Sequence, residues 1–260
     1  MLWIYLSPHL DDVALSCGGL ISQQTSTGEM VEIWTVCAGD PPPGSFSTFA
    51  EELHARWQTG REATASRRQE DLASCARLSA TCHHLPVPDC IYRRAGLDYW
   101  NLNDLAKPRR LLEQADFMYP DREAIFGALH PLEDDQVRQL AHRLGELVPG
   151  MAELVCPMGL GKHVDHQLTR AAAEILGRPL WYYADYPYAV QAGTEIAALE
   201  ANGWRKQRFP ISPAAMEAWI QAVAAHQSQI STFWPDFSAM QTAIQAYHDL
   251  FNGAVLWKKS

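Results

Sequence analysis

The chain opens with the stretch Leu2-Trp-Ile-Tyr-Leu-Ser-Pro-His-Leu-Asp-Asp12, in which an apolar run leads into a group of polar side chains. Residues 2–6 lack polar alternation and are rich in β-forming side chains, so they predict a strand that is buried on both faces. Residues 13–24, which come next, have the composition of a helix. A buried strand that leads into a helix is typical of parallel α/β sheets, in which ligands bind beyond the carboxyl ends of the strands. The polar group at 7–12 is expected in that position.

Apolar runs alternate with helical segments along the rest of the chain. Further strands are expected at 30–37, near 84–87, at 152–157 and at 180–184. Further helices are expected at 49–80, 136–147, 167–176, 214–229 and 238–251. Residues 88–120 have no clear period and predict loop and short helix. This alternation favours an α/β fold with a mainly parallel sheet flanked by helices. Because no repeat or linker divides the sequence, residues 1–260 are predicted to form a single domain.

Composition and charge exclude several classes of protein. The chain has 260 residues and a formal net charge of −9, whereas proteins that bind nucleic acid need Lys and Arg for the phosphates. The N-terminal apolar run ends at residue 6, which is too short for a signal peptide or a membrane span. Six cysteines are too few for a disulfide framework in a chain of this length. We therefore expect a cytoplasmic protein that binds neither nucleic acid nor membrane.

Two groups of potential metal ligands follow predicted strands, one at 7–12 and one at 159–166. Their side chains are His9, Asp11, Asp12, His163, Asp165 and His166. Taken separately, the first could be a helix cap and the second a cluster in a surface loop. Together they could supply two imidazoles and a carboxylate to a catalytic zinc ion, which typically has three protein ligands and an open position for water. Since other groups remain for acid–base chemistry, this set favours a metal-assisted hydrolase over a structural metal site.

The two groups also carry a family resemblance. The sequence resembles the PIG-L/LmbE family of zinc-dependent N-deacetylases, whose motifs P-H-x-D-D and H-x-D-H stand at Pro8–Asp12 and His163–His166. The resemblance implies a Rossmann-like fold, a zinc cofactor and hydrolysis of an N-acetyl group, most often on an amino sugar. One departure is Val13, where many members of the family have Glu. Because that Glu is not a metal ligand, the expected zinc site is unaffected.

The resemblance gives each residue of the two motifs an expected role. The implied zinc ligands are His9, Asp12 and His166. Asp11 would be the general base that accepts a proton from zinc-activated water. His163 would stabilise the oxyanion or donate a proton, and Asp165 would orient His163.

Substrate contacts are expected in less regular parts of the chain. A partial match to the family covers 68–72 and 85–89, where some members have an Arg and an Asp that touch the sugar. In the aromatic segment 181–188, Asp185 and Tyr186 come just after the strand predicted at 180–184 and are therefore also expected at the carboxyl side of the sheet. The candidate substrate contacts are Arg68, Asp89, Asp185 and Tyr186. An alternative for Arg68 is the solvated face of a helix, and residues 40–60 form either a lid or a plain surface helix.

The expected function is removal of an N-acetyl or other acyl group from a small N-acetylated amino sugar or glycoconjugate. One alternative is an amidase that acts on a non-sugar acyl-amine, because the metal ligands serve only the carbonyl. Another is an Fe(II) oxygenase with a facial triad of His9, Asp11 and His166. That triad would leave Asp12 and His163 without a role. A metal-free binding module is the remaining alternative.

Overall fold

A seven-stranded sheet runs through the centre of the protein in a computed structural model that describes residues 1–100 and 116–259. The strands are β1 (Leu2–Ser7), β2 (Met30–Thr35), β3 (Thr81–His84), β4 (Glu153–Pro157), β5 (Leu180–Tyr183), β6 (Trp204–Phe209) and β7 (Ala254–Lys259). Their order across the sheet is β3-β2-β1-β4-β5-β7-β6. Strands β1 to β5 are parallel, whereas β7 is antiparallel to its neighbours β5 and β6. The predicted α/β fold with a mainly parallel sheet is confirmed.

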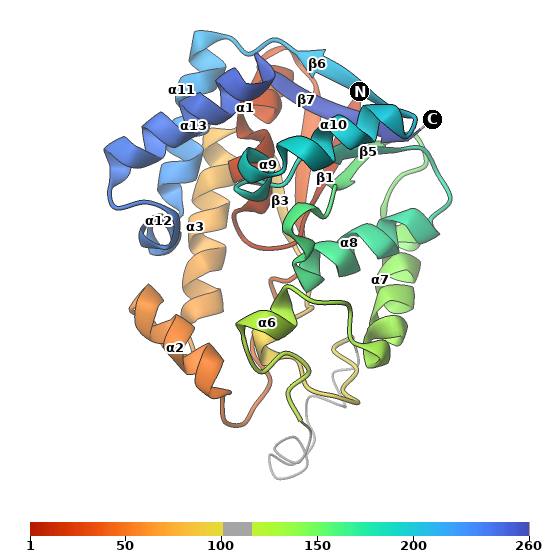
Figure 1. Cartoon of the computed structure of the whole chain (residues 1–260), viewed down its shortest axis with the longest axis vertical. Coiled ribbons are helices and arrows are strands. Elements are labelled where there is room, and N and C mark those ends of the chain that lie inside the picture. The colour runs from red at the N-terminus through yellow and green to blue at the C-terminus, as the bar shows by residue number, and fades with distance from the viewer. Residues whose placement is uncertain (101–115, 260) are drawn as a thin grey trace.

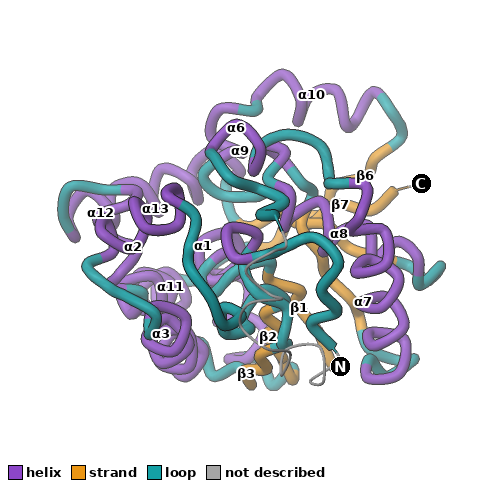
Figure 2. Tube along the Cα trace, turned by 90° about the horizontal axis from the view of Figure 1, so that it is seen from below, coloured by secondary structure: helices purple, strands orange, loops and turns teal. Residues whose placement is uncertain are grey.

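Helices cover both faces of the sheet, as Figures 1 and 2 show. They are α1 (Asp12–Ser26), α2 (Thr48–Trp57), α3 (Ala63–Arg77), α6 (Arg122–Ile125), α7 (Asp134–Leu147), α8 (Val164–Ile175), α9 (Tyr188–Gln191), α10 (Gly193–Ala201), α11 (Pro213–Ala225), α12 (Gln227–Phe233) and α13 (Phe237–Phe251). Helices α1, α3 and α11 pack together on one face, and α7 and α8 pack on the other. Within the described ranges, no helix is long and apolar enough to cross a membrane.

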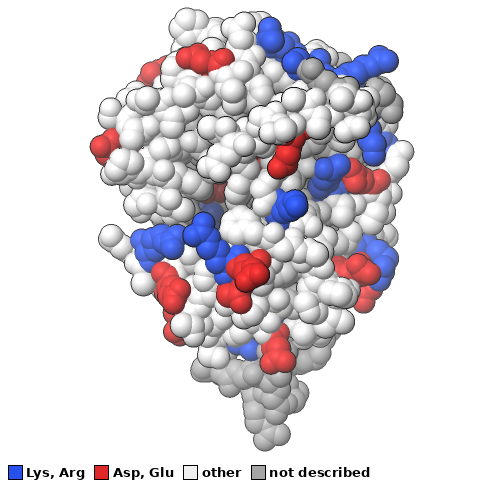
Figure 3. All heavy atoms as spheres, in the orientation of Figure 1, with Lys and Arg blue, Asp and Glu red and all other residues white. Residues whose placement is uncertain are grey.

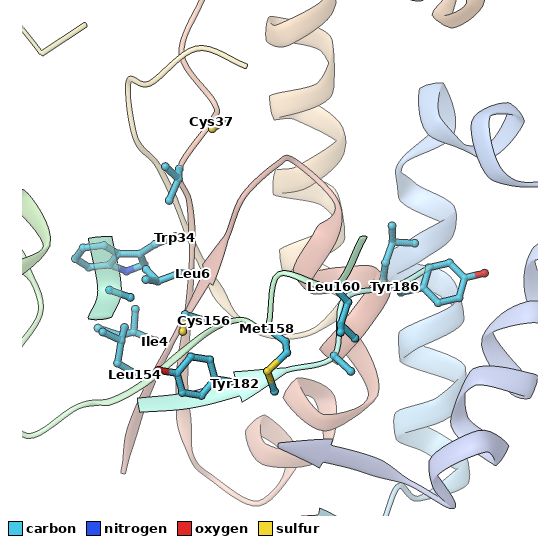
Figure 4. Close-up of a cluster of buried hydrophobic side chains, with 14 of the residues drawn as sticks. Ile4, Leu6, Trp34, Cys37, Leu154, Cys156, Met158, Leu160, Tyr182 and Tyr186 are labelled. Atoms are coloured by element: carbon cyan, nitrogen blue, oxygen red, sulfur yellow. The ribbon is translucent and has the colours of Figure 1, made fainter. Parts of the chain in front are cut away.

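The central strands are buried on both faces, as their continuous apolar runs predict. Ile4 of β1, Leu154 of β4 and Tyr182 of β5 belong to the core on one face, and Figure 4 shows these side chains close together. Tyr5 and Val155, which alternate with them, belong to the core on the opposite face. This double burial holds β1 and β4 rigidly side by side, so that whatever follows them is placed accurately.

A glycine pair in α1 lets α11 approach closely. A Cβ atom on Gly18 would lie 2.3 Å from Cδ1 of Trp219, and one on Gly19 would lie 2.6 Å from Cε3 of the same ring. The Trp219 indole N–H donates to the carbonyl oxygen of Ala14 at 2.7 Å. The indole therefore occupies the space left by the two missing side chains and fixes α11 against the helix that follows β1.

Three predicted elements differ from the structure. The helix predicted at 49–80 is two helices, because Gln58 takes a left-handed conformation (φ 55°) that ends α2. The strand predicted near 84–87 lies at Thr81–His84, since Pro86 and Pro88 lack the N–H groups that a ladder needs. The helix predicted at 214–229 breaks at His226, which separates α11 from α12.

The strands β6 and β7 and the helix α10 were not expected from the sequence. β6 reads Trp-Arg-Lys-Gln-Arg-Phe and lies at the edge of the sheet with its middle four residues exposed, so it has no apolar run. Of the segment 88–120, residues 90–92 form a short 3-10 helix, and residues 101–115 lie outside the described ranges.

Candidate active site

The two polar motifs meet at the carboxyl ends of β1 and β4. These strands are hydrogen-bonded neighbours, with Ile4 opposite Leu154. Helix α1 begins at Asp12, directly after the first motif, and His163 caps the start of α8. Residues that are far apart in the sequence therefore come together at the N-terminal ends of two helices, which is where parallel sheets place their ligand sites.

Asp12 lies between two histidines, one from each motif. Its Oδ2 is 3.0 Å from Nδ1 of His9 and 3.3 Å from Nε2 of His166. The backbone N–H of His9 also donates to this oxygen, at 2.8 Å. His163 is close by, with its ring 4.8 Å from that of His9 in an edge-to-face arrangement. The three imidazoles offer nitrogens within 4.8 Å of one another, so this cluster could hold a metal ion.

A buried carboxylate lies behind each of the two histidines that contact Asp12. Asp165 Oδ2 is 2.8 Å from Nε2 of His9, and Asp185 Oδ1 is 2.6 Å from Nδ1 of His166. Both carboxylates are completely buried. Burial lowers the pKa of His166, but the charges of Asp12 and Asp185 outweigh it and raise that pKa to about 10. Such carboxylates fix the orientation of metal-binding histidines and increase their basicity.

The family resemblance implies that Asp165 orients His163, but the carboxylate of Asp165 contacts other groups. Besides His9, it accepts from the backbone N–H of Cys90 at 3.1 Å and forms an ion pair with Arg93. Arg93 is completely buried and also pairs with Glu133. The guanidinium charge offsets the two carboxylates and keeps Asp165 ionised, with its pKa well below the usual range. Arg93 was not singled out in the sequence because it lies in the segment that shows no period.

His163 is held by the backbone rather than by a carboxylate. Its Nδ1 accepts a hydrogen bond from the backbone N–H of Asp165 at 3.2 Å. An accepting Nδ1 carries no proton, so the neutral ring must carry its proton on Nε2. Burial and the neighbouring His9 lower the pKa of His163 to about 3, which keeps the ring neutral. His163 is thus an uncharged N–H donor at the centre of the site.

Asp11 is the second carboxylate of the first motif, and its environment differs from that of Asp12. Within the described residues no hydrogen bond joins its carboxylate to a histidine; its ion pair is with Nη2 of Arg67, at 3.6 Å. Burial raises the pKa of Asp11 to about 6, although Arg67 opposes this shift. A carboxylate with a pKa in this range is suited to accept a proton near neutral pH.

The structure brings Arg67, rather than its neighbour Arg68, to the site. The guanidinium of Arg68 donates to the carbonyl of Ala38 and to Asp40, both at 2.7 Å, outside the cluster. Arg67 is buried, lies 4.0 Å from Asp89, and has an Nε–H without a hydrogen-bond partner among the described residues. The buried positions in α3 recur with the period of a helix, and Arg67 and Asp71 are two of them. That period could have indicated Arg67 from the sequence.

The other candidate substrate contacts have different environments. Asp89 is beside the site, with Oδ2 3.9 Å from Nε2 of His9. Asp185 is at the site but is occupied by His166 and by the backbone N–H of Leu160. Tyr186 is buried away from the cluster, where its ring packs on Trp234 and Tyr247.

The site opens on one face of the molecule. Figure 3 shows a hollow there, with α12 and α9 above it and α2 and α6 below, and with acidic and basic side chains at its floor. A narrow crevice adjoins Asp11 and is lined by residues of α11 and α12. It includes His226, which is buried and whose two ring nitrogens have no partner within the described ranges. His226 had no metal-ligand spacing in the sequence and was not predicted to belong to the site.

Imidazoles and carboxylates gathered at the carboxyl edge of a parallel α/β sheet are suited to hold a metal ion for hydrolysis. The family described as GlcNAc-PI de-N-acetylase, PIG-L, matches residues 4–176. The chain therefore belongs to the PIG-L family and is an N-deacetylase, an enzyme that hydrolyses linear amides. This confirms the resemblance seen in the two motifs, and it favours the hydrolase over the iron oxygenase and the metal-free binding module.

The chain is also similar to individual deacetylases, to one in sequence and to two in fold. The 2'-N-acetylparomamine deacetylase of Niallia circulans is 27% identical over 220 residues, which cover 78% of this chain and 72% of that protein. The zinc-inhibited form of teicoplanin deacetylase has the same fold, with a TM-score of 0.75, 24% identity and coverage of 99% and 97% of the two chains. The N,N'-diacetylchitobiose deacetylase of Pyrococcus horikoshii is more distant, with a TM-score of 0.51, 17% identity and coverage of 96% and 78%.

Proposed function

We propose that this chain is a zinc-dependent deacetylase that releases acetate from an N-acetylated amino sugar carried by an aminoglycoside-like or glycopeptide-like molecule. The observation that carries the proposal is the buried carboxylate behind each of the two histidines beside Asp12. The relatives of similar sequence or fold include deacetylases of 2'-N-acetylparomamine and of teicoplanin, which supports this substrate class.

The donor atoms fit a zinc ion held by His9, Asp12 and His166. In a tetrahedral site with ligands about 2.0–2.1 Å from the metal, neighbouring ligand atoms lie about 3.3 Å apart. Asp12 Oδ2 is 3.0 Å and 3.3 Å from the two histidine nitrogens, close to that spacing. We place His163 outside the ligand set because its second nitrogen contacts a backbone N–H, whereas zinc-binding histidines usually have a carboxylate or carbonyl there.

A zinc ion in this position would polarise the amide carbonyl and acidify the attacking water. Asp11 would then accept the proton of that water, because its carboxylate is free of the histidines and its pKa is about 6. The same proton would pass to the nitrogen of the leaving amine, so that the amide is exchanged for a carboxylate and an amine. Arg67, 3.6 Å from Asp11, would hold the carboxylate in place during both transfers.

His163 would stabilise the negative oxygen that develops on the carbonyl. Its neutral ring has Nε2–H as the remaining donor, because Nδ1 is occupied by the backbone of Asp165. A donor that is already oriented before the reaction costs no reorganisation when charge appears, and loss of one such donor typically lowers kcat by about 10²–10³.

Arg67 and Asp89 are the proposed contacts for the sugar. Arg67 lies 3.6 Å from Asp11, and Asp89 lies 3.9 Å from His9. The buried Arg67 keeps an Nε–H that no described residue accepts. A guanidinium and a carboxylate together offer donors and an acceptor to the hydroxyl groups of a sugar ring.

The test is release of free amine from a panel that includes 2'-N-acetylparomamine, a glycopeptide that carries an N-acetylated amino sugar, and an N-acetylated amino acid ester. We expect the zinc-loaded protein to hydrolyse at least one of the two amino-sugar substrates and His166→Ala to hydrolyse neither. Turnover of the amino acid ester alone would instead identify an amidase for non-sugar substrates. No release from any of them by folded, zinc-loaded protein would contradict the proposal.

A further inference from the structure

A second group of metal-binding side chains lies at the outer edge of the sheet, two strands away from β1. Helix α3 supplies Asp71 and Cys75, which are four residues apart and therefore share one face of the helix. Strand β3 supplies Cys82 and His84, which are two residues apart and point to the same side of the strand. The short turn between α3 and β3 brings these two faces together.

Three of the four side chains, Asp71, Cys82 and His84, are in mutual contact, and Cys75 lies close to two of them. Nε2 of His84 is 2.9 Å from Oδ2 of Asp71, and Sγ of Cys82 is 3.2 Å from that nitrogen and 3.4 Å from that oxygen. The ligand atoms of Asp71, Cys75 and Cys82 all lie within 4.8 Å of one another. Both cysteines are free thiols. Thr35 of β2 donates a further hydrogen bond to Asp71, at 3.1 Å, and fixes the carboxylate.

We propose that Asp71, Cys75, Cys82 and His84 form a second metal site, which binds a structural zinc ion. In a tetrahedral zinc site the Cys sulfurs are about 2.3 Å and the His nitrogen and carboxylate oxygen about 2.0–2.2 Å from the metal, which puts neighbouring ligand atoms about 3.3–3.8 Å apart. The contacts among Asp71, Cys82 and His84 are 2.9–3.4 Å, and the ligand atom of Cys75 lies within 4.8 Å of those of Asp71 and Cys82, so small shifts of these side chains would admit the ion.

The composition of the group selects both the metal and its role. Two thiolates with one imidazole favour zinc over magnesium or calcium, which prefer oxygen ligands. Four protein ligands fill a tetrahedral site and leave no position for water, so this ion stabilises the fold and takes no part in hydrolysis. The site proposed for hydrolysis contains no cysteine ligand, and the two sites are therefore chemically distinct.

The surroundings also suit the loading of a metal. Asp71 and Cys75 are buried, whereas Cys82 and His84 are partly exposed on an edge strand, which gives an ion access from solvent. Binding of the ion would release the protons of the two thiols.

A metal at this position would tie α3 to β3. Asp71 lies one helical turn beyond Arg67, whose guanidinium is 3.6 Å from Asp11. The second site would thus hold the helix that carries Arg67. Loss of the second metal ion is expected to loosen the position of Arg67 beside the first site, without removing a zinc ligand from that site.

The test compares the zinc content and the cobalt spectrum of the purified full chain with those of three variants. We expect about two zinc ions per wild-type chain and about one in Cys82→Ser or in Asp12→Ala. Replacement of zinc by Co²⁺ should give a thiolate-to-cobalt charge-transfer band that Cys82→Ser loses and Asp12→Ala keeps. The matched control is Cys90→Ala, since Cys90 is the cysteine near His163 and Asp165. It should keep the band.

The possible outcomes separate this site from the proposed catalytic zinc. Loss of the band in Cys90→Ala, or no band in the folded wild-type protein loaded with cobalt, would overturn the second site. A Cys75–Cys82 disulfide in place of bound metal in protein purified without reductant would overturn it too. If Asp12→Ala kept its full zinc content while the band persisted, only the ligands of the first site would be wrong. Circular dichroism of each variant verifies that it is folded.

Discussion

Asp11 and Asp12 are adjacent in the chain, yet their different environments suit them to different chemical roles. Asp12 is shared by His9 and His166, whose charges hold its pKa well below the usual range despite burial. Asp11 has a raised pKa and only Arg67 as an ion-pair partner. One carboxylate is thereby suited to stay ionised beside a metal, and the other to exchange a proton. This division is the central feature of the proposed chemistry.

Replacement of Asp11 by Asn tests the division directly. Asn keeps the size of the side chain but cannot accept the proton, so kcat should fall by about 10²–10⁴ while the zinc content stays unchanged. Turnover and zinc content should be measured on the same preparation. Loss of zinc in proportion to the loss of activity would show that Asp11 is a ligand instead of the base.

The two adjacent arginines provide a matched pair. Arg67→Ala removes a buried guanidinium beside Asp11 and Asp89, so kcat/KM should fall by a factor of about 10–100, roughly 1.4–2.8 kcal/mol of transition-state stabilisation. Arg68→Ala removes a guanidinium that contacts Ala38 and Asp40 and should change kcat/KM little. Steady-state kinetics on both variants decide the point, and an effect of equal size at the two positions would refute the assignment.

The elements that carry the site were predictable because their sequence patterns are local. β1 and β4 are apolar runs followed directly by polar motifs, and those motifs lie where the sequence analysis expected them. The partners of the motif residues were not predictable, since they depend on packing between distant segments. Arg93 reaches Asp165 from a segment without periodicity, and Asp185 turns toward His166 instead of the hollow. β6 was missed because an exposed edge strand has no apolar run.

The contact between α1 and α11 has a measurable consequence. In Gly18→Ala the new methyl group would lie 2.3 Å from the Trp219 ring, and the required shift should lower the free energy of unfolding by about 1–3 kcal/mol. Gly145→Ala is the control, because that helical glycine meets only Leu176, at 3.6 Å. It should raise stability by about 0.5–1 kcal/mol. Urea unfolding of both variants measures these effects; equal stabilities would show that the close contact between α1 and α11 is absent.

At the scale of the whole molecule, the proposed catalytic site is built from distant parts of the chain. β1 and β4 pair directly, and β7, formed by residues 254–259, pairs with β5. The sheet contains strands from both ends of the chain, so we expect it to unfold as one unit. This is the behaviour predicted for a single domain. Circular dichroism and tryptophan fluorescence should give coincident unfolding curves in urea. Two separated transitions would instead reveal independent units.

The proposed zinc ligands can be examined most directly by anomalous diffraction at the zinc absorption edge from crystals of the wild-type protein. The expected result is a peak within bonding distance of His9 Nδ1, Asp12 Oδ2 and His166 Nε2, with His163 unbound and Asp11 free to act as base. A peak bound by His163 in place of Asp12, or no zinc between the two motifs in crystals of active enzyme, would contradict this account.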